Sequence, residues 1–196
     1  MEPKSKLPHK GKRLVITGIP TIGKTTLAKQ LAEAVGGICV PSEDIRHELR
    51  LNPKYTDATN FWKDKNKRAY YINTSYDKQW KNLVDQSERL WEGILEKINS
   101  YKDEERPVIF EGVSLMPHLV HKDLDFPCIV IVGANLENVI EGNKEKPRWE
   151  SEELELQSVA LFLGDQPYFK AEAEKYNYPV FKNSDEAFKE ALKILE

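Results

Sequence analysis

The sequence has few cysteines, no long apolar run and no large excess of charge of one sign. Its two cysteines, Cys39 and Cys128, each lie in an apolar, strand-like segment, and we interpret both as buried, reduced thiols. We therefore expect a reducing compartment and a cytoplasmic protein. No apolar run approaches the length of a membrane-spanning helix, so we expect no membrane contact. The net charge of −3 argues against nucleic-acid binding driven by bulk charge, although a local basic patch would escape this test.

Metal clusters, repeats and linkers are also missing. The four histidines lack the neighbouring ligands of a metal site. Residues 1–12 are basic but contain no hydrophobic core of an export signal, and we interpret them as a flexible tail. Because a chain of 196 residues can bury a proper core, we expect residues 13–196 to form one domain.

Short apolar segments alternate with helical patterns along the chain. These segments are residues 14–17, 38–41, 108–111, 128–133 and 179–182. Several are apolar throughout, which is typical of strands covered on both faces. The alternation predicts an α/β fold with a five-stranded parallel sheet between two layers of helices.

Residues 18–26 read GIPTIGKTT, which fits the phosphate-binding loop pattern G-x-x-x-x-G-K-T between a strand and a helix. Glycines let such a loop turn tightly, and the N–H groups at the helix start can face an anion. Lys24 can reach the β- and γ-phosphates, and the Thr25 hydroxyl can ligate Mg²⁺. The motif predicts a three-layer P-loop NTPase fold that uses ATP and Mg²⁺. The residues expected to bind the nucleotide are Gly18, Ile19, Pro20, Thr21, Ile22, Gly23, Lys24, Thr25 and Thr26.

A polar helical segment follows the second strand, with Ser42 as its N-cap. Asp44 falls at the carboxyl end of that strand, where ligands bind in open α/β sheets. We expect Asp44 to orient or deprotonate an acceptor hydroxyl, the alternative being an acid favoured merely by the helix dipole. Arg46 and Arg50, four residues apart, share a helix face and would clamp an anionic acceptor.

Two later strands also end in polar residues. Glu111 closes the third strand and is followed by Gly112. Because P-loop chemistry needs an acid on the metal side, we expect Glu111 to serve Mg²⁺ or, with Gly112, the substrate. The alternative for Glu111 is a carboxylate that caps backbone N–H groups. Asn183 follows the last strand and is placed to approach the nucleotide base.

Two segments between the strands have open interpretations. Residues 143–150 interrupt a helical pattern with positive charges, either as a solvated loop or as a lid whose Arg148 closes over the phosphates. Residues 52–80 would select the acceptor. Within them residues 63–68 bring basic side chains among aromatic ones, a pattern that can bind single-stranded nucleic acid. We favour a solvated helix with an aromatic packing stripe.

The chain resembles the P-loop small-molecule kinases and, among them, the archaeal 2-phosphoglycerate kinases. Residues 42–50 look like that family's Thr/Ser-Asp-x-Ile-Arg-x-x-x-Arg segment. Residues 74–80 are similar to its Ser-Ser-Tyr-x-x-Trp stretch, and residues 86–117 to its long helix and strand-Glu-Gly-Val-His-Leu-x-Pro. Ser114 stands where the family places His, and residues 144–148 depart from its His-x-x-Arg-Phe pattern.

Together these observations predict an ATP- and Mg²⁺-dependent kinase, 2-phosphoglycerate kinase-like, that phosphorylates a hydroxyl of a small anionic acceptor. Lys24, Asp44 and Arg148 would be its catalytic residues, and the chain would act as a monomer or a homodimer. One alternative is a nucleic-acid or tRNA-linked P-loop kinase that uses residues 63–68. Another is a nucleotide-dependent switch or ATPase without an acceptor, for which no water-orienting residue is apparent.

Overall fold

The computed structural model describes residues 9–145 and 151–196. Five strands form one parallel sheet in the order β2-β3-β1-β4-β5. The strands are β1 (Arg13–Gly18), β2 (Ile38–Pro41), β3 (Val108–Glu111), β4 (Cys128–Ile131) and β5 (Val180–Phe181). All five were expected from the apolar segments, and the α/β prediction is confirmed. Because the strands are parallel, their carboxyl ends lie at one edge of the sheet.

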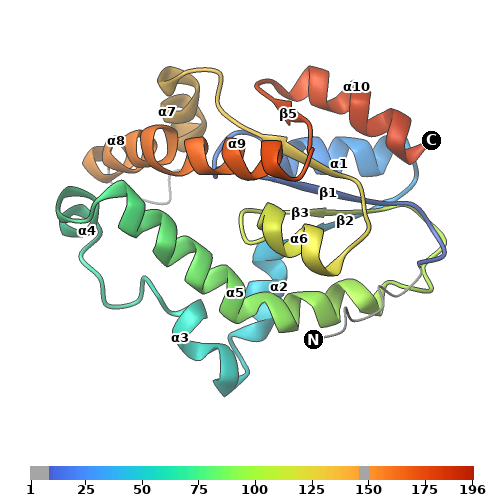
Figure 1. Cartoon of the computed structure of the whole chain (residues 1–196), viewed down its shortest axis with the longest axis horizontal. Helices are drawn as coiled ribbons and strands as arrows, with labels where there is room; N and C mark the ends of the chain where they lie inside the picture. Colours follow the sequence, from blue (N-terminus) through green and yellow to red (C-terminus); the bar gives the residue numbers. More distant parts are fainter. Residues whose placement is uncertain (1–8, 146–150) are drawn as a thin grey trace.

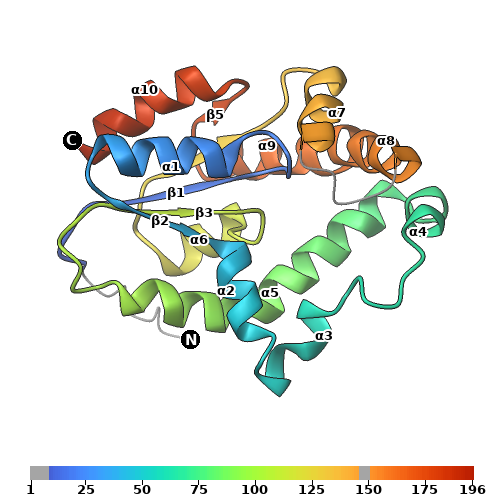
Figure 2. The same ribbon diagram turned by 180° about the vertical axis from the view of Figure 1, so that it is seen from behind.

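Helices cover both faces of the sheet (Figures 1 and 2). On one face, α1 (Lys24–Ala34) and α10 (Ser184–Leu195) pack with Leu14 and Ile16 of β1. On the other, α5 (Tyr76–Ser100), α6 (Pro117–Asp123) and α9 (Gln166–Lys175) share a core with Val15. Alternate residues of β1 therefore enter two separate cores, as strands covered on both faces require.

The remaining elements gather at the carboxyl edge of the sheet. They are α2 (Ser42–Leu49), η1 (Pro53–Tyr55), α3 (Thr56–Thr59), α4 (Lys67–Asn73), α7 (Leu136–Glu145), α8 (Ser151–Val159) and the π-helix η2 (Ala160–Asp165). The solvated helix expected around residues 63–68 is shorter than predicted, because α4 begins only at Lys67 and the residues before it form short elements separated by loops. Asn52 and Asn66 cap two of these elements through their side chains. No helix in the described part of the chain is long and apolar enough to span a membrane.

The beginning of the described chain is tied to the loop before β3. The backbone N–H of Lys10 donates to Lys102 at 2.9 Å, and that of Gly11 donates to Glu104 at 3.2 Å. The guanidinium of Arg13 adds bonds to the Tyr101 and Glu104 carbonyls at 2.6 and 2.7 Å. Residues 10–12 of the expected tail therefore have backbone hydrogen-bond partners, whereas residues 1–8 lie outside the described residues.

Candidate active site

The loop between β1 and α1 has the backbone conformation of an anion cradle. Gly18 has φ +129°, and a Cβ there would lie 1.9 Å from the Ile131 carbonyl oxygen. Thr21 and Gly23 also have positive φ, at +67° and +83°, and a β-branched residue adopts such a value only where the surrounding structure enforces it. No side chain caps the start of α1. Its first N–H groups are therefore available to a phosphate.

Lys24, Thr25 and Glu111 meet beside this loop. The Lys24 side chain is buried, and its Nζ donates to the Ile19 carbonyl. The Thr25 hydroxyl donates to Glu111 Oε1 at 2.9 Å, and Glu111 is 4% exposed at the end of β3. A hydroxyl and a carboxylate at this separation fit Mg²⁺, which prefers oxygen ligands and takes few from the protein. The described residues contain no cluster of three His, Cys, Asp or Glu that could hold a metal by itself.

Two adjoining cavities open at this edge of the sheet. The smaller, of about 140 Å³, surrounds the phosphate loop, and the larger, of about 630 Å³, lies against α2, α4, α5 and α8. Pro20, Thr21, Glu43 and Val113 line both cavities. A phosphate in the smaller cavity would therefore face a ligand in the larger one.

The structure gathers most, but not all, of the predicted nucleotide residues around the smaller cavity. Gly112 lies there with Glu111, and a Cβ on it would lie 1.8 Å from the Ser42 Oγ. Ile19 is instead buried in the core, and Gly18 and Ile22 do not line the cavity. The predicted residues that line it are Pro20, Thr21, Gly23, Lys24, Thr25, Thr26, Glu111 and Gly112.

The acid that α2 presents to the cavities is Glu43. Glu43, Arg46 and Arg50 line the larger cavity, whereas Asp44 lines neither cavity. Glu43 and Asp44 are both exposed, so their position on the helix, not their burial, distinguishes them. The reason is rotation of the helix: Ile45 is buried, which places Glu43 and the two arginines on one flank and Asp44 on the other. The signal was in the sequence, because Glu43 precedes Arg46 by three residues and Arg50 by seven.

The two arginines of α2 have different surroundings. Arg46 donates to the carbonyls of Ala58 and Thr59 at 3.3 and 3.1 Å, which ties α3 to α2, while its buried Nε has no partner. Burial lowers the pKa of Arg46, and the negative charge of the nearby Glu43 partly opposes this shift. Arg50 is exposed on the cavity side, and within the described residues neither arginine forms an ion pair.

Aromatic side chains of residues 52–80 form another wall of the larger cavity. Trp62, Tyr70 and Tyr71 line it, and the Trp62 ring centroid lies 4.9 and 5.8 Å from those of the two tyrosines. The Tyr71 hydroxyl accepts from Gln157 Nε2 at 3.2 Å, which ties α4 to α8. These rings pack against one another, as the packing-stripe interpretation requires, and they also line the cavity, which that interpretation did not predict.

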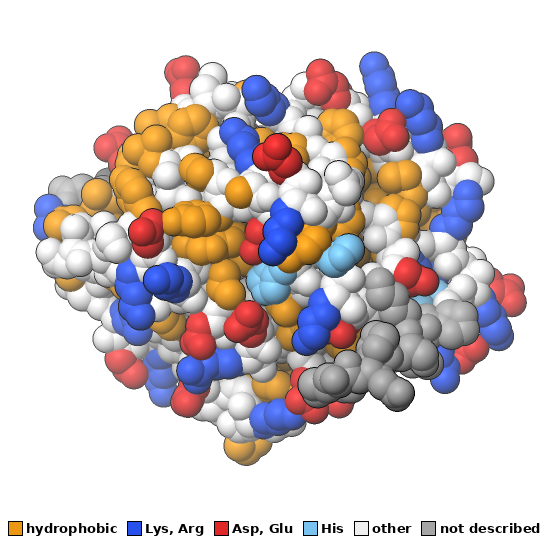
Figure 3. Space-filling model, in the orientation of Figure 1, with side chains coloured by type: hydrophobic (Ala, Val, Ile, Leu, Met, Phe, Trp, Pro, Cys, Tyr) orange, Lys and Arg blue, Asp and Glu red, His pale blue; other side chains and the backbone are white. Residues whose placement is uncertain are grey.

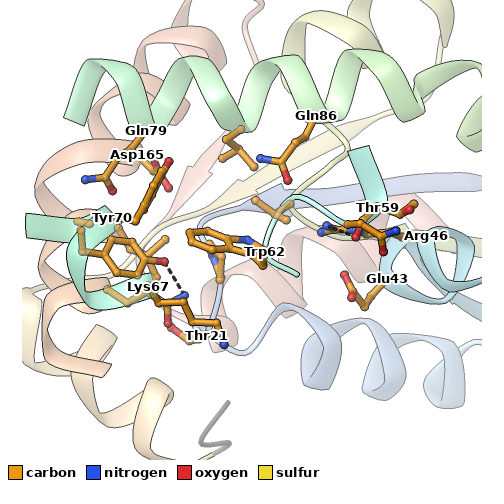
Figure 4. A pocket seen from close by; sticks show the side chains of 18 of the residues that line it. Thr21, Glu43, Arg46, Thr59, Trp62, Lys67, Tyr70, Gln79, Gln86 and Asp165 are labelled. Carbon is orange, nitrogen blue, oxygen red and sulfur yellow. Dashed lines mark hydrogen bonds between the residues drawn. The ribbon is translucent and has the colours of Figure 1, made fainter. Parts of the chain in front are cut away.

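Asp165 closes this wall at the end of η2. Burial raises the pKa of its carboxyl to about 7, because the charged form is poorly solvated there. Figure 4 shows Asp165 beside Gln79 and Tyr70, on the side of the cavity away from Arg46. The sequence offered no signal for this residue.

Elsewhere, burial raises the pKa of Cys39 to about 11, so this thiol is not a nucleophile at neutral pH.

Residues 143–150 were expected to form a lid, and Asn183 was expected to contact the nucleotide base. Asn143 lies in α7, buried, with its Nδ2 donating to Ser158 Oγ at 2.9 Å, and residues 143–145 continue that helix. Arg148, like the rest of residues 146–150, lies outside the described residues. Asn183 caps α10, accepting from the Glu186 N–H at 2.8 Å. The α7 helix itself touches the phosphate loop, because a Cβ on Gly142 would lie 1.9 Å from the Thr21 carbonyl oxygen.

No protein-family model and no curated protein sequence matches the chain. Solved structures do match its fold. TT1252 from Thermus thermophilus is 16% identical, with 94% of this chain and 95% of that chain covered and a TM-score of 0.56. Deoxyadenosine kinase from M. mycoides with bound dATP is 16% identical, with 93% and 96% covered and a TM-score of 0.51. Shikimate kinase from Acinetobacter baumannii in complex with shikimate is 15% identical, with 95% of this chain and 94% of that chain covered and a TM-score of 0.48. The likeness to TT1252 and to the deoxyadenosine kinase shows that this chain shares their fold.

Proposed function

We propose that this protein is an ATP- and Mg²⁺-dependent phosphotransferase that acts on a hydroxyl of a small anionic acceptor. The observation that carries the proposal is the junction of the two cavities. A phosphate loop opens, through Pro20, Thr21 and Glu43, onto a larger cavity that also presents Arg46 and Arg50. In-line transfer needs the donor phosphate and the acceptor on opposite sides of such a junction.

The chain's own residues can each take part in the transfer. Lys24 stabilises negative charge on the phosphoryl oxygens, and the N–H groups at the start of α1 hold the phosphates. Thr25 and Glu111 hold Mg²⁺, which supplies charge neutralisation on the phosphates when it is bound. Glu43 orients the acceptor hydroxyl and takes its proton. Arg46 and Arg50 hold the acceptor's anionic group.

The resemblance to 2-phosphoglycerate kinases makes 2-phosphoglycerate the first acceptor to test. A nucleic-acid strand receives less support, because the aromatic residues line a cavity beside the phosphate loop. Basic and acidic side chains are also interspersed on the face seen in Figure 3 rather than gathered in one basic stripe.

The test measures ADP release from Mg-ATP with a panel of acceptors: 2-phosphoglycerate, other small hydroxy acids, nucleosides, nucleotides and a 5′-hydroxyl oligonucleotide. We expect at least one small anionic compound to stimulate ADP release. Lys24→Ala should lower the stimulated rate roughly 100-fold or more, with circular dichroism as the control for folding. Stimulation by the oligonucleotide alone, or ADP release that no acceptor changes, would contradict the proposal.

A further inference from the structure

The larger cavity has two chemically different ends. We call Arg46 and Arg50 of α2 the cationic end. We call Trp62, Tyr70, Tyr71 and Gln157 the aromatic end. Figure 4 shows Arg46 and Glu43 on one side, Tyr70 and Asp165 on the other, and Trp62 between them. Lys63 and Lys67 also line the cavity, and Figure 4 shows Lys67 beside Tyr70. A ligand that fills the cavity therefore meets two arginines at one end, and planar rings with a further positive charge at the other.

Buried polar atoms without partners concentrate in this cavity. Among the described residues four buried side-chain polar atoms lack a hydrogen bond, and three of them belong to lining residues: Thr21 Oγ1, Arg46 Nε and Gln157 Oε1. More than about 90% of buried polar groups in folded proteins are paired, so this concentration indicates a polar ligand. The Gln157 side chain is 9% exposed and already donates to Tyr71. Its Oε1 is buried and has no hydrogen-bond partner among the described residues, which leaves an acceptor unsatisfied in the wall of the cavity.

The rings at the aromatic end pack against one another and also line the cavity. The α4 helix has no fully buried residue, and Trp62, Tyr70 and Tyr71 are all half-buried. Planar heterocycles stack on such rings, and an amide oxygen beside them can recognise the edge of a base. A three-carbon hydroxy acid such as 2-phosphoglycerate has no ring and would leave this wall exposed.

The cationic end suits a phosphate. Arg50, the C-cap of α2, lies one helical turn from Arg46, and neither forms an ion pair within the described residues. Nη2 of Arg46 already donates to the Ala58 and Thr59 carbonyls, so Arg50 has the less committed guanidinium of the two. Forked guanidinium groups bind phosphate oxygens through paired hydrogen bonds. Glu43, on the same flank, lies at the junction with the phosphate loop.

We infer that the acceptor is a nucleoside monophosphate, with its base on Trp62, its phosphate at the cationic end and a free sugar hydroxyl toward Glu43. This inference rests on the proposed function and names the substrate class of the same cavity. The hydroxyl oxygen forms a bond to the γ-phosphorus as the bond from that phosphorus to the ADP oxygen breaks. The hydroxyl proton passes to the Glu43 carboxylate. The products are ADP and a nucleoside bisphosphate.

The inference is tested by binding, so that it does not depend on turnover. The full chain is saturated with Mg²⁺ and a non-hydrolysable ATP analogue, which occupies the phosphate loop. Calorimetry then compares nucleoside monophosphates of the four bases with the matching nucleosides, with ribose 5-phosphate and with 2-phosphoglycerate. We expect one nucleoside monophosphate to bind at least about 10-fold tighter than its nucleoside and than ribose 5-phosphate, because it alone reaches both ends. Equal affinity for the ring-free phosphates would overturn the inference.

A pair of variants separates ring recognition from folding. Trp62→Leu should weaken nucleoside monophosphate binding roughly 5-fold or more, the loss expected for one base–aromatic stack, and leave ribose 5-phosphate binding unchanged. Phe61→Leu is the control, because the Phe61 ring lies 5.0 Å from that of Trp62 but does not line the cavity. Equal losses in both variants, or no loss in Trp62→Leu, would contradict the inference.

The two proposals fail in different ways. Nucleoside monophosphate binding without acceptor-dependent ADP release would defeat the proposed function and keep the ligand assignment. Acceptor-dependent ADP release with 2-phosphoglycerate, together with no detectable nucleoside monophosphate binding, would keep the proposed function and defeat this inference.

Discussion

Replacing Glu43 by Gln should abolish most phosphoryl transfer without changing stability. The substitution keeps the side chain's size and removes only its capacity to accept the hydroxyl proton. Positioned general bases contribute roughly 10²- to 10⁴-fold, which is about 3 to 5 kcal/mol of activation free energy. The native state should lose little, because the ion contact of Glu43 with His47 is 3.6 Å long and both side chains are about half exposed. Exposed pairs of this kind contribute about 0 to 1 kcal/mol.

The matched control is Asp44→Asn, one residue along the same helix. Asp44 has the same chemical group but lines neither cavity, so its kcat should stay within about twofold of wild type, as expected for a group outside the reaction. The assay is kcat for acceptor-stimulated ADP release at saturating Mg-ATP, with thermal melts of both variants. A large loss in Asp44→Asn with a normal Glu43→Gln would refute the assignment of the base. Equal losses of kcat in Glu43→Gln and Asp44→Asn would indicate that the two carboxylates act only through their negative charge and that neither is the base.

Three further predictions concern the metal, the packing of α7 and pH. Glu111→Gln should raise the Mg²⁺ concentration for half-maximal activity roughly 10-fold or more, measured by Mg²⁺ titration at fixed ATP. Gly142→Ala should lower Tm by about 2 to 12 °C relative to Glu141→Ala, since overpacking against the Thr21 carbonyl costs about 1 to 3 kcal/mol. The hydrogen bond to Glu172 raises the pKa of His118 above the ordinary 6.5, although burial of the ring opposes this shift. Its stabilising effect should therefore be complete below pH 6.5 and lost as pH rises through the folded pKa; a pH series of Tm should fall over that range in wild type but not in His118→Gln.

The phosphate loop and the sheet were predictable because their signals are local. A strand covered on both faces needs an apolar run, and a phosphate loop needs glycines where φ is positive. Gly18 and Gly23 have those values, and each of the five apolar segments overlaps a strand. The pairing of Thr25 with Glu111 also follows, since β3 lies beside β1 and ends at the same edge.

The wall of the larger cavity was less predictable because tertiary contacts, not sequence period, shape it. Residues 54–76 have no continuous apolar stripe, and the short α3 is fixed by Arg46, which bonds the carbonyls of Ala58 and Thr59. The choice of Glu43 over Asp44 as the acid at the cavity could be predicted only in part from the sequence. It depends on which face of α2 is buried, and Ile45 in the sequence already indicates that face.

Asp165 reaches the larger cavity because it shares a helix face with earlier lining residues. From α8 the chain continues through η2 into α9. Gln157, Leu161 and Asp165 follow one another at intervals of four residues, and all three line the cavity. Residues at this spacing lie on one face of a helix. The spacing gains meaning only once α8 packs against α4, where Gln157 bonds to the Tyr71 hydroxyl. The burial that raises the pKa of Asp165 to about 7 is therefore a consequence of tertiary packing, which the local pattern does not specify.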